Sequence, residues 1–243
     1  MYNLSPISLA EMEKVKLLNR VDTKFLTTDT VVSHLLDLAA DDFLIQEIDG
    51  KRLMHYYTMY FDTDDVKMYY DHQRGKKSRR KVRIRQYLDS DSPTFLEIKD
   101  KNNKGRTKKH RIEMTAGDKI IDYPDFISKY CEFSPESLSP KIENRFSRIT
   151  LVNKERTERI TIDTSLEFNN FVTRQQVRLP SLAIIEWKRD ALAASSPLKA
   201  LLWKLRIHES GFSKYCIGMA LSDPSLPQNR IKKRLLLLKK LLY

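Results

Sequence analysis

Several residue types and patterns are scarce in this 243-residue chain, and each shortage excludes a class of protein. Two cysteines, Cys131 and Cys216, cannot supply a disulfide framework or a four-cysteine zinc site, so both are interpreted as core thiols. Only six glycines and a hydrophobic content of 41% exclude collagen-like and disordered chains. No apolar run reaches the roughly 18 residues of a membrane span, and no secretory signal begins the chain. We therefore expect a soluble, cytoplasmic, globular protein.

Common catalytic and nucleotide-binding motifs are also missing. Residues 75–78 read GKKS, like the end of a P-loop, but the first required glycine position holds Tyr70. The sequence contains no GxGxxG, no HExxH, no helix-turn-helix signature and no zinc-finger spacing. The five histidines lack ligand spacing and are interpreted as structural or exposed.

Positive charge is abundant. The chain has 44 Lys and Arg against 32 Asp and Glu, which gives a formal net charge of +12. Such an excess predicts a polyanionic partner, which could be nucleic acid, an anionic membrane or a phosphate chain. Net charge does not distinguish these partners, so the positions of the cations along the chain must.

The local pattern predicts strands and helices within one domain that covers residues 1–243, because no linker, repeat or change in composition divides the chain. Helices are expected from Ser8, over 31–40 with Thr30 as N-cap, within 123–138, from Ser196, and over the basic tail 228–243. Eight strands are expected, at residues 19–26, 54–63, 79–88, 94–101, 107–114, 145–154, 158–168 and 181–190.

Several of these strands pair a cationic face with an apolar face. Side chains two residues apart share a face, so Lys81, Arg83 and Arg85 lie together while Val82 and Ile84 point the other way. The same alternation recurs over 95–101, 107–114 and 184–188.

Two arrangements explain this alternation. In the first, a sheet packs on one side and exposes ordinary charges to solvent on the other. In the second, an α+β fold closes eight antiparallel strands into a barrel with a cationic tunnel inside and helices packed outside. Like charges on neighbouring strands repel one another, so the repetition favours the barrel with a bound anion. Closure also removes unpaired strand edges.

A linear phosphate chain suits such a tunnel better than nucleic acid. Binding of single-stranded nucleic acid needs aromatic side chains interleaved with the cations, and Tyr87 is the only aromatic on the face of Arg83 and Arg85. A phosphate chain needs only positive charge and forked donors, which arginine supplies. We therefore expect no specific nucleic-acid partner.

The order of short motifs between residues 20 and 218 resembles that of the vacuolar transporter chaperone (VTC) catalytic domain. This domain is the polyphosphate polymerase branch of the triphosphate tunnel metalloenzymes. The motifs are RVDTKF, YFDT, KVRIRQY, FLEIK, TKKHRI, ENRF, ERITIDTSL, IIEWK and GFSKY.

The resemblance implies that the tunnel binds ATP or triphosphate and a growing polyphosphate chain. Arg111 and Lys188 are added because they share strand faces with Lys109 and Glu186. The expected roles are catalytic for Arg83, Arg85, Lys99, Arg145, Arg159 and Lys214, substrate-binding for Lys24, Lys109, Arg111, Lys188 and Ser213, and metal-binding for Glu186 with Mn²⁺ or Mg²⁺.

One departure separates this chain from the hydrolytic branch of those enzymes. That branch begins with E-x-E-x-K, and the corresponding positions here are Arg20, Asp22 and Lys24. A cation replaces the first carboxylate, which argues against a carboxylate-rich, two-metal hydrolytic site. The expected activity is transfer of the γ-phosphoryl group of ATP to polyphosphate. The alternatives are an inorganic triphosphatase of the same fold and a non-catalytic module that binds polyphosphate or another polyanion.

Three further residues or segments have two interpretations each. Glu97 either pairs with a neighbouring cation, which we favour, or binds metal. Asp22 is a second metal contact or a partner for Arg20. The basic tail 228–243 plugs one tunnel end, or its amphipathic spacing places it on a membrane surface.

Overall fold

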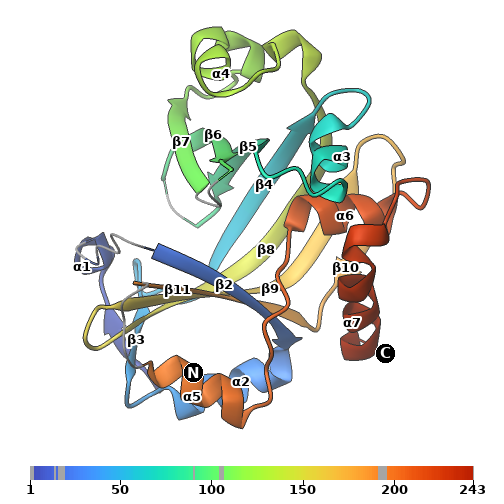
Figure 1. The fold of residues 1–243 in the computed structure, drawn as a ribbon. Helices are drawn as coiled ribbons and strands as arrows, with labels where there is room; N and C mark the ends of the chain where they lie inside the picture. The colour runs from blue at the N-terminus through green and yellow to red at the C-terminus, as the bar shows by residue number, and fades with distance from the viewer. Residues whose placement is uncertain are drawn as a thin grey trace.

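The computed structural model describes residues 3–13, 15, 20–89, 91–103, 107–190 and 196–242. These residues form one large, mainly antiparallel sheet with helices on both sides, which is an α+β fold (Figure 1). The strands are β1 (Ser5–Ile7), β2 (Arg20–Thr28), β3 (Phe43–Gln46), β4 (Met54–Asp62), β5 (Arg79–Tyr87), β6 (Thr94–Lys101), β7 (Thr107–Met114), β8 (Ser139–Asn153), β9 (Glu158–Asn170), β10 (Gln176–Leu179) and β11 (Leu182–Asp190). The α-helices are α1 (Leu9–Glu13), α2 (Asp29–Leu38), α3 (Lys67–Gln73), α4 (Pro124–Tyr130), α5 (Pro197–Lys204), α6 (Lys214–Ser222) and α7 (Lys232–Leu242).

Eight of the strands follow one path of antiparallel neighbours, in the order β2-β11-β9-β8-β4-β5-β6-β7. They are the eight segments that alternation predicts, and their existence is confirmed. Three short strands extend the sheet beyond the prediction: β1 pairs in parallel with β3, β3 pairs with β8, and β10 pairs with β9.

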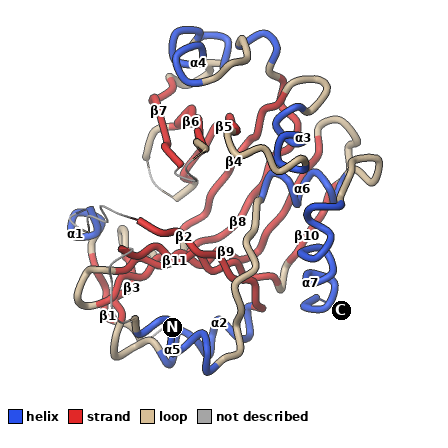
Figure 2. The backbone as a smooth tube through the Cα atoms, in the orientation of Figure 1, coloured by secondary structure: helices blue, strands red, loops and turns tan. Residues whose placement is uncertain are grey.

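The sheet curls so that its two halves face each other across a concave side (Figure 2). Lys99 on β6 and Glu186 on β11 stand five strand positions apart along the path, which is about 24 Å in a flat sheet. Glu186 nevertheless acts electrostatically on Lys99, so the two side chains approach each other across the concavity. Irregularities at Tyr60/Phe61 and at Arg145/Ser147 interrupt the ladder and assist the bend.

The predicted closed barrel is not what the described residues form, because no hydrogen-bonded ladder joins β2 to β7. Instead, the backbone amides of Ser210 and Gly211 donate to the carbonyl oxygen of Lys24, so the segment before α6 occupies the free edge of β2. The other edge strand, β7, carries exposed Lys108 and Lys109, and such charges discourage pairing with further strands. The alternation of polar and apolar residues predicts which face of the sheet a side chain lies on. It does not predict whether the two end strands, β2 and β7, pair with each other.

Helices cover the apolar outer face of both halves, as expected. Ile162 of β9 and Ile185 of β11 lie in one apolar cluster with Leu36 of α2 and Leu202 of α5. On the other half, Ile98 of β6 and its buried neighbours lie in a cluster that includes Ile127 of α4.

Helix α6 departs from the expectation, because it packs on the concave side. A Cβ atom added to Gly218 would lie 2.5 Å from Cδ1 of Phe168 and 2.8 Å from Cδ1 of Ile142. Ile142 stands opposite Tyr60, which stands opposite Arg83, so Ile142 belongs to the same sheet face as this arginine. The close approach at Gly218 therefore seats α6 over one end of the concave side.

The structure corrects two smaller predictions. Helix α2 begins at Asp29 rather than at residue 31, and its N-cap is Thr28, whose hydroxyl accepts from the amide of Val31. The predicted tail helix is divided into a 3₁₀ turn, Asn229–Ile231, followed by α7, and its last residue lies outside the described residues. Among the described helices, none is long and apolar enough to span a membrane.

Candidate functional site

The basic concave face is the sheet face that carries Lys24, Arg83, Lys99, Arg148 and Glu186. Strand register builds its first half from rows across β5, β6 and β7. Lys99 stands between Lys81 and Lys109, so three ammonium groups share one row. This row contains no carboxylate, and cross-strand cations repel each other.

The next row contains a buried counter-ion. Glu97 stands between Arg83 and Arg111 in register, and its side chain is only 1% exposed. Nε and Nη2 of Arg83 donate to Oε2 of Glu97 at 2.8 and 2.5 Å, and Nζ of Lys109 lies 3.4 Å from Oε1. Burial opposes ionisation, but Arg83, Arg85 and Lys109 hold the pKa of Glu97 at about 2. The interpretation of Glu97 as an ion-pair partner is confirmed.

The second half of the face comes from β2, β11 and β9. Glu186 stands opposite Lys24, and its carboxylate lies 3.5 Å from Nζ of Lys24 and 2.5 Å from Nζ of Lys188. Burial opposes ionisation of Glu186, but Lys24 and Lys188 bring its pKa well below the usual range. Arg159 of β9 stands opposite Lys188 and so joins the same face.

A third charged group lies where β8 and β9 meet α6. Nε and Nη2 of Arg148 donate to the two carboxylate oxygens of Asp163 at 2.5 and 2.8 Å, and Lys214 also pairs with Asp163. Nζ of Lys214 lies 3.6 Å from the ring centroid of Phe146. Burial lowers the pKa of Lys214 more than the neighbouring Asp163 raises it, so this pKa falls to about 7.

Arg145, the arginine that the sequence singled out on this strand, lies outside this group. Arg145 is exposed and stands opposite Tyr57, on the sheet face away from Arg148, and its guanidinium lies 5.0 Å from the ring centroid of Tyr57. The available signal was the predicted hairpin of β8 and β9. Counting pairs outward from its turn places Arg148, and not Arg145, directly opposite Asp163.

Arg85 and Lys99 are cations of the face whose pKa values lie below their ordinary values. Arg85 lies over the rings of Tyr56 and Phe146, and its buried Nε has no hydrogen-bond partner in the described structure. Burial and then Arg83 reduce the pKa of Arg85 to about 10. Arg83 and then burial bring the pKa of Lys99 well below its ordinary value. These shifts mean that the face repels further positive charge and favours an anion.

Ser213 connects the sheet to α6. Its hydroxyl accepts from Nζ of Lys81 at 2.8 Å and, as the N-cap of α6, from the amide of Cys216 at 3.2 Å. Alternation predicts Lys81 on the cationic face, but none of the motifs gives it a role. Its position beside Ser213 places it in the site, and burial brings its pKa to about 8.

The structure therefore brings together most of the residues that the sequence singled out. Arg111 lies at the exposed rim, with its guanidinium 4.7 Å from the ring centroid of Phe95, and Arg145 lies on the opposite face. The side chain of Arg20 lies outside the described residues, and Asp22 stands opposite Lys188 in register. Besides Arg111 and Asp22, which register places on the same face, the residues of the basic concave face include Lys24, Arg83, Arg85, Lys99, Lys109, Arg159, Glu186, Lys188, Ser213 and Lys214, with Lys81, Arg148 and Asp163 in addition.

A divalent cation fits this face only together with a phosphate ligand. The described residues contain no group of three or more His, Cys, Asp or Glu side chains that could hold a metal ion. Glu186 offers one carboxylate, which Lys24 and Lys188 already contact. Mg²⁺ and similar ions are often held by one or two carboxylates plus substrate phosphates, and Glu186 fits that mode.

A curled antiparallel sheet with arginines and lysines on its concave side defines an α+β protein with an anion-attracting face. A model of the VTC domain family matches residues 19–222, so the chain belongs to this family. Among curated proteins, no sequence match was found.

One solved structure with low sequence identity shares the fold at a TM-score of 0.50, and two others match with lower scores. A putative adenylyl cyclase from Hippeastrum, described as having a dominant triphosphatase activity, is 14% identical with a TM-score of 0.50, over 85% of this chain and 98% of its own. The PH1819 protein from Pyrococcus horikoshii OT3 is 12% identical with a TM-score of 0.46, and the match covers 83% of this chain and 98% of that protein. An inorganic triphosphatase, NE1496, is 11% identical with a TM-score of 0.31, and the match covers 74% of this chain and 83% of that protein.

Proposed function

We propose that this protein is a polyphosphate polymerase that transfers the γ-phosphoryl group of ATP to the end of a polyphosphate chain and releases ADP. Membership of the VTC domain family supports a polyphosphate-related or triphosphate-binding function. The observation that carries the proposal is the row of Lys81, Lys99 and Lys109, which contains three cations and no carboxylate. An extended ligand with a negative charge on every unit neutralises such a row.

Phosphoryl transfer asks the protein mainly for positioning and for neutralisation of charge. Arg83 and Arg85 lie on one strand with their guanidinium groups on the same face, so they can contact successive phosphate groups. Lys99 lies across from Lys24 and Glu186, which allows the two halves of the sheet to hold one ligand between them. These contacts keep the reacting phosphates in line.

The acceptor of this reaction needs no general base. A terminal phosphate is already an anion at neutral pH, so no proton must leave it before attack. The carboxylates of the face are held in ion pairs: Glu97 with Arg83 and Asp163 with Arg148. Their low pKa values keep them ionised and poorly basic, which suits transfer to a phosphate better than activation of water.

Glu186 is the carboxylate that would hold Mn²⁺ or Mg²⁺ together with the phosphates of the substrate. Such an ion would supply additional neutralisation of charge on the transferred group. Lys24 and Lys188, which contact Glu186, keep the carboxylate ionised and oriented towards the concave side.

One assay distinguishes the proposed activity from its alternatives. The purified protein is incubated with ATP and Mn²⁺, or with inorganic triphosphate and Mn²⁺, and the products are separated on a gel. A ladder of long phosphate chains from ATP supports the polymerase. Orthophosphate released from triphosphate, without a ladder, identifies a triphosphatase instead. Retention of polyphosphate without turnover identifies a binding module.

A further inference from the structure

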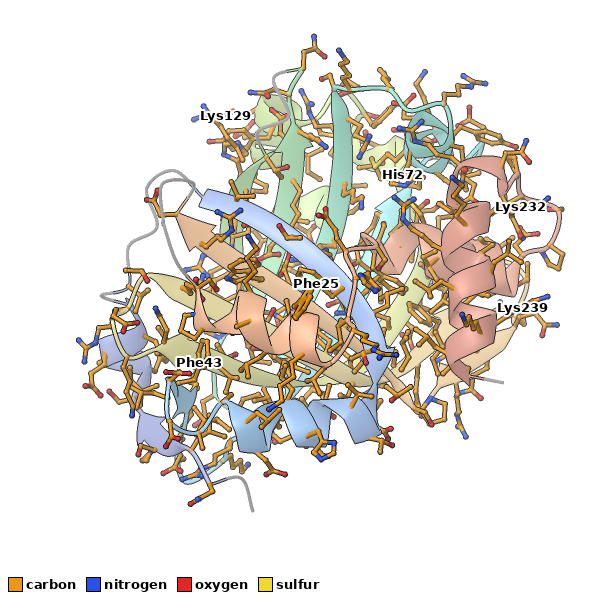
Figure 3. All side chains as sticks on the ribbon, turned by 60° about the horizontal axis from the view of Figure 1, so that its bottom comes forward. Phe25, Phe43, His72, Lys129, Lys232 and Lys239 are labelled. Atoms are coloured by element: carbon orange, nitrogen blue, oxygen red, sulfur yellow. The ribbon has the colours of Figure 1, made fainter. Side chains whose placement is uncertain are left out.

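A pocket of about 250 Å³ continues from the basic concave face towards α3 and α7. Lys24, Lys81 and Ser213 line it on the side of the sheet, and they belong to the site described above. The opposite wall is formed by other elements: His72 comes from α3 and Arg234 from α7. Figure 3 shows His72 at the same end of the molecule as α7, which carries Lys232 and Lys239. We call this cavity the α3–α7 pocket.

The α3–α7 pocket has more positive than negative charge. Arg79, Lys81, Lys24 and Arg234 line it, against the carboxylates of Asp22 and Glu209; the remaining lining residues include Phe212, Ile217 and Ile231. Within the described part of the chain, none of the ion pairs involves Arg79, Lys81 or Arg234. Arg234 is held in place by its Nε, which donates to the carbonyl oxygen of Ser210 at 2.9 Å.

Arg230 adds a further cation beside the pocket. A Cβ atom on Gly75 would lie only 2.5 Å from Nη1 of Arg230, so the glycine leaves room for this guanidinium at the end of α3. Gly75 also has a φ of +74°, which glycine adopts without strain. The local structure therefore keeps Arg230 close to Arg79 in spite of their like charges.

The positively charged groups around the pocket repel one another and disfavour protonation of His72. Burial, and then Lys81, Arg79, Arg234 and Arg230, reduce the pKa of His72 to about 3. Burial and then Arg230 also reduce the pKa of Arg79. The buried Nδ1 of His72 has no hydrogen-bond partner in the described structure. An anion in the pocket relieves this repulsion, which the carboxylates of Asp22 and Glu209 offset only in part.

We propose that the α3–α7 pocket is a second phosphate subsite, which holds the part of a linear polyphosphate chain that extends beyond the phosphates on the basic concave face. This inference rests on the proposed function. Arg230 and Arg234 lie after residue 222, where the match to the VTC domain model ends, so these two cations are features of this chain outside the matched region. Because Lys24, Lys81 and Ser213 belong to the basic concave face and also line the pocket, one bound chain can contact both.

The test compares two ligands and two pairs of cations on one terminal segment. The affinities of wild type, R230S/R234S and K239S/K240S are measured by calorimetry for inorganic tripolyphosphate and for medium-length polyphosphate. Lys239 and Lys240 are exposed on α7 and do not line the pocket, so the control removes the same charge. We expect R230S/R234S to weaken binding of the longer chain by about tenfold, because two charged donors are lost. Tripolyphosphate binding by this variant, and both affinities of the control, should stay within about twofold.

A charge-preserving variant, R230K/R234K, is the second arm, and melting temperatures show that each variant is folded. If it keeps most of the affinity for the longer chain, charge at these positions is the cause. Equal long-chain affinity of wild type and R230S/R234S overturns the subsite, and so does an equal loss for K239S/K240S. If wild type binds neither ligand, the proposed function itself is wrong. A preference for a single-stranded oligonucleotide over polyphosphate at the same charge also overturns the assignment.

Discussion

Replacement of Glu97 by glutamine tests whether this carboxylate is the counter-ion that keeps the cationic strands β5 and β6 together. Its side chain is 1% exposed and contacts Arg83 through two hydrogen bonds and Lys109 through a longer ion pair. Glutamine preserves the size of the side chain and removes only the charge. Arg83 then keeps a buried positive charge without its partner.

The magnitude follows from the pKa of Glu97, which falls from an ordinary value of 4.5 to about 2 on folding. At about 1.4 kcal/mol per pKa unit, the ionised carboxylate stabilises the fold by about 3 kcal/mol. A depressed carboxylate pKa contributes stability above pH 4.5, and the contribution is lost as the pH falls through about 2. At neutral pH, the E97Q variant should therefore melt about 6–12 °C lower than wild type.

The assay is thermal unfolding at pH 7 with and without tripolyphosphate. A bound anion supplies the negative charge that the variant lacks, so the ligand should raise the melting temperature of E97Q more than that of wild type. The control is E167Q. Glu167 pairs with Arg178 at 3.4 Å, but both side chains are well exposed, so its loss should change stability by less than about 1 kcal/mol.

Two results would refute this reasoning. If E97Q unfolds at the temperature of wild type, the ion pair contributes no net stability, and the repulsion within the face has been overestimated. If tripolyphosphate stabilises E97Q less than wild type, Glu97 participates in ligand binding, which is the metal-binding role that the structure disfavours.

Three further predictions concern the arginines of β8, the lysines of low pKa, and the packing of α6. R148A should weaken tripolyphosphate binding, measured by calorimetry, by about tenfold or more. R145A, on the opposite sheet face, should leave the affinity within about twofold. Equal losses would show that the assignment of the two arginines to opposite faces is wrong. A bound anion favours the protonated forms of Lys214 and Lys81, whose pKa values are about 7 and 8, so affinity should fall as the pH rises from 7 to 9. The K214R variant should reduce this dependence, and a wild-type affinity that is flat with pH would contradict the prediction. G218A should lower stability by about 1–3 kcal/mol in thermal unfolding, because its Cβ would overlap the side chains of Phe168 and Ile142; an unchanged melting temperature would mean that α6 does not pack tightly against the sheet.

Local alternation was sufficient to predict the eight main strands and their faces. In β5, Val82 and Ile84 point to the outer helices while Arg83 and Arg85 point to the concave side, as period-two alternation requires. Packing does not override this pattern, because a shift by one residue would bury the arginines in the apolar cluster. The amino-acid sequence alone was thus enough to assign the candidate site to one face of the sheet.

Longer-range features could not be predicted in the same way. In the described structure no ladder joins β2 to β7, and the segment around Ser210, which follows α5, occupies the edge of β2 instead. Nothing in the local pattern of residues 209–213 indicates that this segment pairs with a strand. The assignment of Arg145 has a different cause: β8 alternates regularly from Ile142 to Arg148, which puts Arg145 and Arg148 on opposite faces, whereas motif spacing alone assigned the role to Arg145.

The placement of α6 connects these points to function. Lys214 reaches Asp163 only because Gly218, one turn later, allows the helix to lie directly on the sheet. The same helix begins at Ser213, which accepts from Lys81 on β5. One short helix therefore joins the two halves of the sheet through a lysine and a hydroxyl, and hydrogen bonds between β2 and β7 are not needed to hold the cations around one ligand. The anion-binding geometry depends on α6 more than on closure of the barrel.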